Sequence, residues 1–213
     1  MRRIAPIAAA LFAAIALTGA GQQAPQRMYQ AYTDQQKADL DRISAYLNTI
    51  HSLRSAFLQI SPEGQAVQGV VYIQKPGQIR FEYRPPSPVL IVATGGAVYV
   101  KNSKLNTVDK YDLSDTPLGL LLDGNADLAH NKGVLGVEAR EGEIVVKART
   151  TTNRNNSNIT MVFAAPAIEL RQWMVKDNQG GLTTVALQSP QINAPIDPAA
   201  FDVPVKAPRT AGK

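Results

Sequence analysis

The spacing of hydrophobic positions in this chain changes at about residue 50. Between residues 33 and 50 they recur every three or four positions, which predicts an amphipathic helix. Thr33 and Gln36 have the spacing of a capping box at its start. The predicted apolar stripe consists of Leu40, Ile43, Tyr46, Leu47 and Ile50. A stripe of this kind has to lie on other apolar surface.

Beyond residue 52, apolar and polar positions alternate in about eleven short runs. Turns containing Pro, Gly, Asn or Asp separate the runs, which predicts antiparallel pairing of neighbours. The predicted strands are 53–60, 67–74, 79–84, 89–93, 97–100, 107–113, 133–139, 144–150, 159–163, 168–175 and 183–187. Thr116-Pro117 and Asp123-Gly124 bracket a leucine-rich helix over 118–122, and a further helical turn is predicted over 126–130.

The clearest single element is a hairpin over residues 69–83, with its turn at Pro76-Gly77. The opposite face of its return strand carries Arg80, Glu82 and Arg84, so one face of this sheet is wet. The apolar face carries Val71, Ile73, Ile79, Phe81 and Tyr83. Something else in the molecule must cover that apolar face.

The pattern leaves open what that cover is. One possibility is a core filled by its own side chains. The other is a hollow enclosed by curved strands and roofed by the two helical segments. A barrel inserted in a membrane is disfavoured, because the strands are short and two helical segments would have to be accommodated.

Composition narrows the class of protein. The chain has 213 residues, 45% hydrophobic and 18% charged, which fits one globular domain with a sizeable core. Residues 1–20 have the basic start, short apolar run and small residues of a secretory signal peptide. We expect residues 21–213 to form a single domain, with 21–32 and 204–213 loose.

The chain contains no cysteine, which excludes disulfides and thiolate metal sites. Its net charge of +5, which falls to +3 without Arg2 and Arg3 of the signal peptide, is mild and dispersed and gives no nucleic-acid footprint.

No constellation of residues indicates catalysis. His51 and His130 lack ligand-spaced partners, and no Gly-x-Ser-x-Gly motif occurs. The acidic residues fall mostly at turns, and a structural role in those turns explains them better than catalysis does. We therefore expect a non-enzyme without cofactor or metal, and a hydrolase is the distant alternative.

Taken in order, the motifs resemble the outer-membrane lipoprotein carrier family (LolA) of Gram-negative bacteria. The resemblance extends from about residue 40 to 203. Its residues are Phe57-x-Gln59, Gly69 to Ile73, Lys75-Pro76-Gly77-x-Ile79-Arg80-Phe81-x-Tyr83-x-x-Pro86, Val89 to Val92 before Gly95, Val98-Tyr99-Val100, Thr116-Pro117, Trp173 with Asp177 and Gly180, and Phe201.

The resemblance implies an incomplete antiparallel β-barrel roofed by short helices that form a lid. It also implies a monomeric periplasmic carrier that takes acylated lipoproteins from an inner-membrane ABC exporter and passes them to an outer-membrane receptor. An acyl chain of about sixteen carbons costs on the order of 12 kcal/mol to expose to water, so a carrier has to hide it. The alternative is an envelope-sensing or regulatory domain that binds lipid or lipoprotein without transport.

The resemblance also assigns roles to single residues. Lys75 stands where the family usually has arginine, and it is similar to a latch that hydrogen-bonds the lid backbone. Lysine keeps the charge but lacks the planar fork of donors. The implied lining of the lipid cavity is Val71, Ile73, Ile79, Phe81, Tyr83, Val89 and Ile91. The implied lid residues are Ile43, Leu47, Ile50, Leu118, Leu120 and Leu121.

Overall fold

The computed structural model describes residues 32–150, 157–177 and 179–204. The predicted signal peptide at 1–20, and nearly all of the two segments expected to be loose, lie outside these residues. The described residues are mainly β, as predicted, with eleven strands, two α-helices and two short 3₁₀-helices.

Helix α1 spans Asp34–Thr49, one residue shorter at each end than predicted. The predicted capping box is present, because the Thr33 side chain accepts from the Gln36 N–H and the Gln36 side chain accepts from the Thr33 N–H. Leu40, Ile43 and Leu47 are completely buried along one stripe of the helix. The period of the apolar residues therefore identified the face that packs on the sheet.

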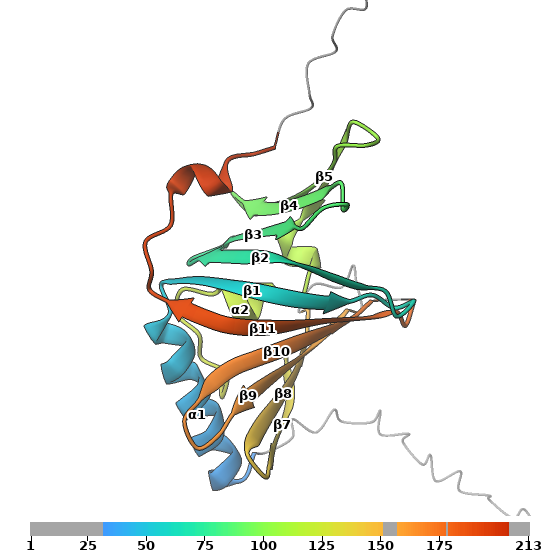
Figure 1. The fold of residues 1–213 in the computed structure, drawn as a ribbon. Coiled ribbons are helices and arrows are strands. Elements are labelled where there is room, and N and C mark those ends of the chain that lie inside the picture. The colour runs from blue at the N-terminus through green and yellow to red at the C-terminus, as the bar shows by residue number, and fades with distance from the viewer. Residues whose placement is uncertain (1–31, 151–156, 178, 205–213) are drawn as a thin grey trace, which may run out of the picture. The chain divides into compact units, whose positions relative to one another are not determined.

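All eleven strands belong to one antiparallel sheet, in the order β6-β5-β4-β3-β2-β1-β11-β10-β9-β8-β7. Figure 1 shows β1 and β11, the first and last strands of the chain, side by side in the middle of the sheet. Strands β6 and β7 are the two edges and do not pair, so the sheet does not close into a barrel. The strands are β1 (Ser52–Ile60), β2 (Ala66–Gln74), β3 (Gln78–Tyr83), β4 (Val89–Thr94), β5 (Ala97–Asn102), β6 (Thr107–Asp112), β7 (Val134–Arg140), β8 (Glu143–Arg149), β9 (Asn158–Ala164), β10 (Glu169–Lys176) and β11 (Leu182–Ile192).

Strand β11 is longer than the predicted 183–187, since it continues past Pro190 to Ile192. Proline lacks an N–H and normally ends a strand, but the register between β1 and β11 shifts at this point. The Ser55 hydroxyl occupies the shift, donating to the Gln188 carbonyl and accepting from the Gln188 N–H. A side chain of β1 thus replaces the ladder bonds that this bulge removes.

The connection between the two edges carries the other helical segments, η1 (Leu113–Asp115) and α2 (Gly119–Leu122). Helix α2 matches the predicted segment 118–122. The helical turn predicted over 126–130 is wrong, because residues 126–127 have no regular structure and 128–130 form a simple turn. The Asn48 side chain of α1 donates to the Ala126 carbonyl, which is the acceptor that the first intrahelical bond of this turn would use.

The side chains of the sheet face that packs against α1, here called the inner face, form one apolar cluster with α1 and α2. Four rings of this cluster, Phe57, Phe81, Tyr83 and Trp173, meet mostly edge to face with centroids 5.3–6.4 Å apart. The Phe57 ring lies against Gly69, where an added Cβ would collide with the ring and with the Glu82 carbonyl. A glycine in mid-strand therefore makes room for an aromatic ring.

The opposite, outer face is covered locally by η2 (Pro198–Phe201), which packs against β3 and β4. In Figure 1 this red turn lies next to the end of β4. Val92 is completely buried although it pairs with Arg80 of the outer face. The Arg80 guanidinium donates to the Ala200 carbonyl, which fastens η2 to the sheet.

Candidate functional site

The turn between β2 and β3 touches both helical segments of the inner face. The Lys75 ammonium donates a hydrogen bond of 2.9 Å to the Leu47 carbonyl in the last turn of α1. Two residues later, the Gly77 N–H donates to the Leu122 carbonyl at the end of α2, at 3.0 Å. The turn at 75–77 therefore joins α1 to α2 through one side-chain and one backbone bond.

Lys75 makes its hydrogen bond from a half-buried position. Burial lowers the pKa of its ammonium from the ordinary 10.5 to about 8, because less water is left to solvate the charge. The carboxylate of Asp123, just after α2, acts in the opposite direction and favours the charged form. A neutral amine can also donate to Leu47, so the bond is compatible with either protonation state.

Two polar side chains of α1, one turn apart, hold the segment that follows α2. Asn48 makes a pair of bonds to Ala126, donating to its carbonyl at 3.0 Å and accepting from its N–H at 2.7 Å. Ser44 donates to the Leu40 carbonyl and accepts from the Leu128 N–H at 3.0 Å. We call α1, α2 and residues 123–130 together the lid, since these bonds make them one connected unit.

Side chains at the start and in the middle of α1 fasten it to the other half of the sheet. Gln36 and Tyr32 donate to carbonyls of the edge strand β7. Arg42 donates to the Pro166 carbonyl at 2.7 Å, and the Tyr46 hydroxyl accepts from the Leu170 N–H. Polar bonds therefore hold α1 along its whole length, while its buried apolar stripe packs on the sheet.

The structure places the residues implied as a cavity lining on the inner face of β2, β3 and β4. Val71, Ile73 and Ile79 are at most 1% exposed, and Phe81 is 6% exposed. Tyr83 and Ile91 are partly buried and pack against the same cluster, and Ile91 pairs with Phe81. Val89, at the start of β4, is only partly buried. Six of the seven residues therefore belong to one apolar surface or pack directly on it.

The residues implied as the lid belong to the same cluster from the other side. Ile43, Leu47, Ile50 and Leu121 are at most 3% exposed. Leu118 and Leu120 are partly buried and pack against the cluster. Sequence reasoning missed three residues of the lid, Leu128 and the α1 residues Ser44 and Asn48. Polar residues on a helix facing a loop distant in sequence give no periodic signal.

Tyr83 is the polar member of the aromatic cluster. Its hydroxyl donates to the Gln59 side-chain oxygen at 2.9 Å, which accounts for glutamine two residues after Phe57 in β1. Burial raises the pKa of this phenol to about 12, and the bond to Gln59 opposes the shift only in part. The inner face therefore carries a neutral hydroxyl at its border and no charged group of its own among these rings.

Neither a metal site nor a spanning helix emerges from the part of the chain that the structure describes. Within it, no group of three His, Asp or Glu side chains is placed to hold a metal ion. None of its helices has the length and apolarity needed to cross a membrane. The feature left to explain is an apolar surface beneath a polar-bonded lid.

Residues 48–204 match the family described as outer membrane lipoprotein carrier protein LolA. The chain belongs to the outer-membrane lipoprotein carrier family. This family is one of carriers rather than enzymes, and the match includes Lys75, the aromatic cluster, α2 and residues 123–130, whereas most of α1 precedes it. The inner face and its lid are accordingly the candidate site of this LolA-family chain.

Several relatives carry the same description. The chain is 25% identical over 176 residues to the outer-membrane lipoprotein carrier protein of Chromohalobacter salexigens, covering 78% of this chain and 82% of that one. It is 27% identical over 180 residues to the protein of that name from Cupriavidus necator, covering 77% and 82%. An uncharacterized protein of Rickettsia prowazekii is 33% identical over 88 residues, 41% of each chain.

Solved structures are more distant. A LolA superfamily protein from Nitrosomonas europaea has 9% identity and a TM-score of 0.42, covering 78% of this chain and 97% of that one. MucB in complex with MucA(peri) has 10% identity and a TM-score of 0.40, covering 78% and 59%. Membership of the LolA family therefore rests on the sequence matches.

Proposed function

We propose that this protein is a periplasmic carrier that binds the acyl chains of lipoproteins between its lid and its inner face. In this role it carries them from the inner to the outer membrane. One observation supports this most. Apolar side chains of the lid and of β2 and β3 form a single cluster, and polar hydrogen bonds at the margin hold the lid in place.

The energies of the two kinds of contact fit a reversible carrier. Each neutral hydrogen bond that fastens the lid contributes about 1 kcal/mol net, and a bond from a charged group such as the Lys75 ammonium contributes about 1.5–3 kcal/mol. An acyl chain gains about 0.8 kcal/mol for each methylene that it buries, so a few methylenes offset the loss of one such bond. Cargo can therefore displace the bonds at Lys75 and Gly77, and these bonds reform when the cargo leaves.

The proposed partners follow from the path of the cargo. We propose an inner-membrane ABC exporter as the donor of acylated lipoproteins and an outer-membrane lipoprotein receptor as the acceptor. Because the lid closes on apolar side chains without cargo, the carrier binds acyl chains less tightly than an open preformed pocket would. Transfer of the acyl chain to a receptor with a more accessible apolar site then lowers the free energy.

A reconstituted transfer assay tests the proposal. The chain without residues 1–20 is purified and incubated with inner-membrane vesicles that release a triacylated lipoprotein, and then with outer-membrane vesicles. Transfer of the lipoprotein that depends on this protein is the expected result. A stable complex with a partner protein and no release of lipoprotein would instead indicate the regulatory alternative. Absence of any acyl binding would contradict both.

A further inference from the structure

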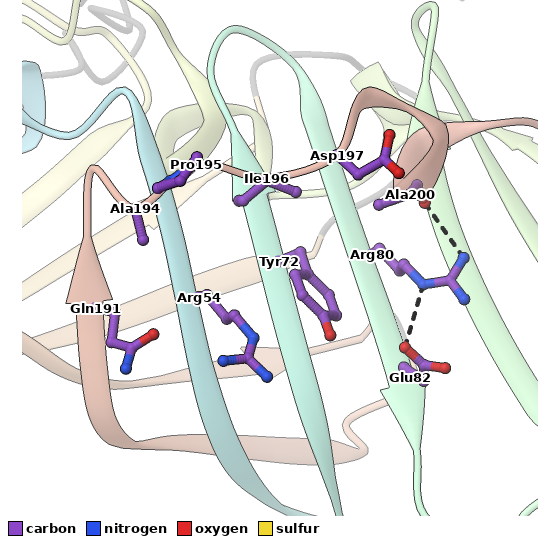
Figure 2. A pocket seen from close by; sticks show the side chains of 10 residues that line it. All are labelled: Arg54, Tyr72, Arg80, Glu82, Gln191, Ala194, Pro195, Ile196, Asp197 and Ala200. Carbon is purple, nitrogen blue, oxygen red and sulfur yellow. Dashed lines mark hydrogen bonds and ion pairs between the residues drawn. The ribbon is translucent and has the colours of Figure 1, made fainter.

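The outer face holds a pocket of about 420 Å³ on the side of the sheet opposite the lid. Its floor is a row of side chains from three adjacent strands, Arg54 of β1, Tyr72 of β2 and Arg80 of β3, which are direct partners in the register. Its wall is the irregular segment 194–197 before η2 (Figure 2). We call it the outer-face pocket.

The two arginines of the floor differ in their partners. Arg80 is occupied, since its Nε lies 3.5 Å from the Glu82 carboxylate and its Nη1 donates to the Ala200 carbonyl. The exposed Arg54 guanidinium lies 5.8 Å from the centre of the Tyr72 ring, and no carboxylate of the described residues is within ion-pair distance of it. Figure 2 shows the Asp197 carboxylate turned away from Arg54. That carboxylate caps η2 through the Ala199 N–H.

The wall of the pocket is tied to the lid. Asn193, which adopts a left-handed conformation with φ 59°, directly precedes it. The Asn193 side chain accepts from the His51 N–H at 2.8 Å and donates to the Thr49 carbonyl, the last residue of α1, at 2.8 Å. The Ser52 hydroxyl donates to the Ala194 carbonyl at 2.6 Å. A displacement of the wall therefore acts on the end of α1 through a single side chain.

We propose that an acidic, extended segment of a partner protein docks in the outer-face pocket, and that its docking displaces the C-terminal end of α1. Arg54 offers a cation for a carboxylate. The Ile196 N–H and carbonyl make no hydrogen bond to another described residue, so an extended peptide can pair with them as an added strand does. A lipid headgroup has no alternating donors and acceptors of this kind.

Docking on this face leaves the inner face free for cargo. Its use for triggering release rests on the proposed carrier function, whereas the binding itself does not. A partner that pulls on segment 194–197 would loosen the hydrogen bond between Asn193 and Thr49, and so would favour the open lid.

The test uses the ¹⁵N-labelled chain from residue 21 onward and an oligoglutamate peptide as the probe. We expect saturable amide shift changes at Arg54, Tyr72 and Ile196. Arg54→Gln should weaken binding about fivefold, as expected for an exposed ion pair. Arg84→Gln is the matched control, because Arg84 is an exposed arginine of the same face outside the pocket, and it should leave the affinity unchanged. A neutral Gly-Ser peptide should give no shifts.

Coupling to the lid is read at the amides of residues 47–50 in the same titration. Asn193→Asp keeps the acceptor for His51 but removes the donor to Thr49, so it should abolish the shifts in α1 while those at Arg54 remain.

Equal weakening by Arg54→Gln and Arg84→Gln would overturn the site, as would displacement of the peptide by phosphatidylglycerol vesicles. Unchanged α1 shifts in Asn193→Asp would overturn the coupling. No arm contains an acyl chain, so failure here is distinct from failure of the carrier proposal.

Discussion

The Lys75 ammonium fastens the lid and titrates in an accessible range of pH. Its pKa falls from 10.5 to about 8 through burial, so the folded protein loses this proton at lower pH than the unfolded chain does. The free energy of unfolding should therefore rise as the pH increases from about 8 to 10.5, and the full cost of burying the charge is present below pH 8.

Lys75→Met should remove this rise, because methionine fills similar space without a titrating group. Urea unfolding of both proteins between about pH 7.5 and 9.5 measures it, a range that stays below the ionisation of Tyr83, whose pKa is raised to about 12. Lys104→Met, at an exposed lysine in the turn between β5 and β6, is the control and should keep the wild-type slope. Identical slopes for Lys75→Met and the wild type would refute this account of Lys75.

Gly69 tests the packing of the aromatic cluster. Gly69→Ala places a Cβ against the Glu82 carbonyl and the Phe57 ring, so β2 and the ring have to shift. We expect a loss of about 1–3 kcal/mol in the free energy of unfolding, as for other overpacked cores. Gly136→Ala in β7 is the control, because no atom lies within 4 Å of the added Cβ. A similar effect at both sites would mean that loss of glycine itself, and not crowding, is measured.

At the scale of elements, the lid should behave as one unit because Ser44 and Asn48 connect α1 to residues 123–130. Asn48→Ala leaves the N–H and carbonyl of Ala126 without their partner. We expect faster hydrogen exchange throughout 118–130, with the strands unaffected, measured by mass spectrometry. Asn125→Ala removes an exposed amide from the same segment and should not change exchange. Acceleration confined to Ala126 would show that the segment does not move as a unit.

The hydrogen bond from Lys75 to α1 should set the cost of opening the lid. At about pH 9 the Lys75 amine is largely neutral, so Lys75→Met then removes the bond without also removing a buried charge. This loss destabilises the closed state by about 1 kcal/mol, which should tighten the apparent binding of an acylated peptide up to about fivefold. Lys75→Arg keeps a donor and a charge, and should stay within about twofold of the wild type. Binding is measured by competition with a fluorescent fatty acid. Weaker binding by Lys75→Met would mean that Lys75 holds cargo instead of the lid.

At the scale of the whole molecule, local pattern accounts for most of the fold. Period-two alternation placed all eleven strands, and the capping box placed the start of α1. The misses have tertiary causes. Ser55 of β1 sustains the bulge that lets β11 run past Pro190, and the Asn48 side chain of α1 bonds the Ala126 carbonyl that a helix at 126–130 would use. Neither cause is visible in the local sequence.

The residues of the candidate site likewise fall into those that the sequence predicted and those that depend on tertiary contacts. The hairpin pattern identified the apolar face, and the resemblance to the LolA family pointed to Lys75 as a residue that bonds the lid. No local signal marked Asn193, because it lies 144 residues from its partner Thr49. Likewise Arg54 and Arg80 reach one pocket only because β1, β2 and β3 are adjacent. Polar contacts between residues distant in sequence could therefore not be predicted from the sequence alone.

The central claim is that acyl chains enter between the lid and the inner face. The chain has one tryptophan, Trp173, which is 1% exposed in the aromatic cluster of that face. Its fluorescence during titration with a lipopeptide carrying brominated acyl chains tests the claim directly, because bromine quenches an indole that it contacts. We expect saturable quenching that the unbrominated lipopeptide does not cause. Binding of the brominated lipopeptide without quenching of Trp173 would contradict the account.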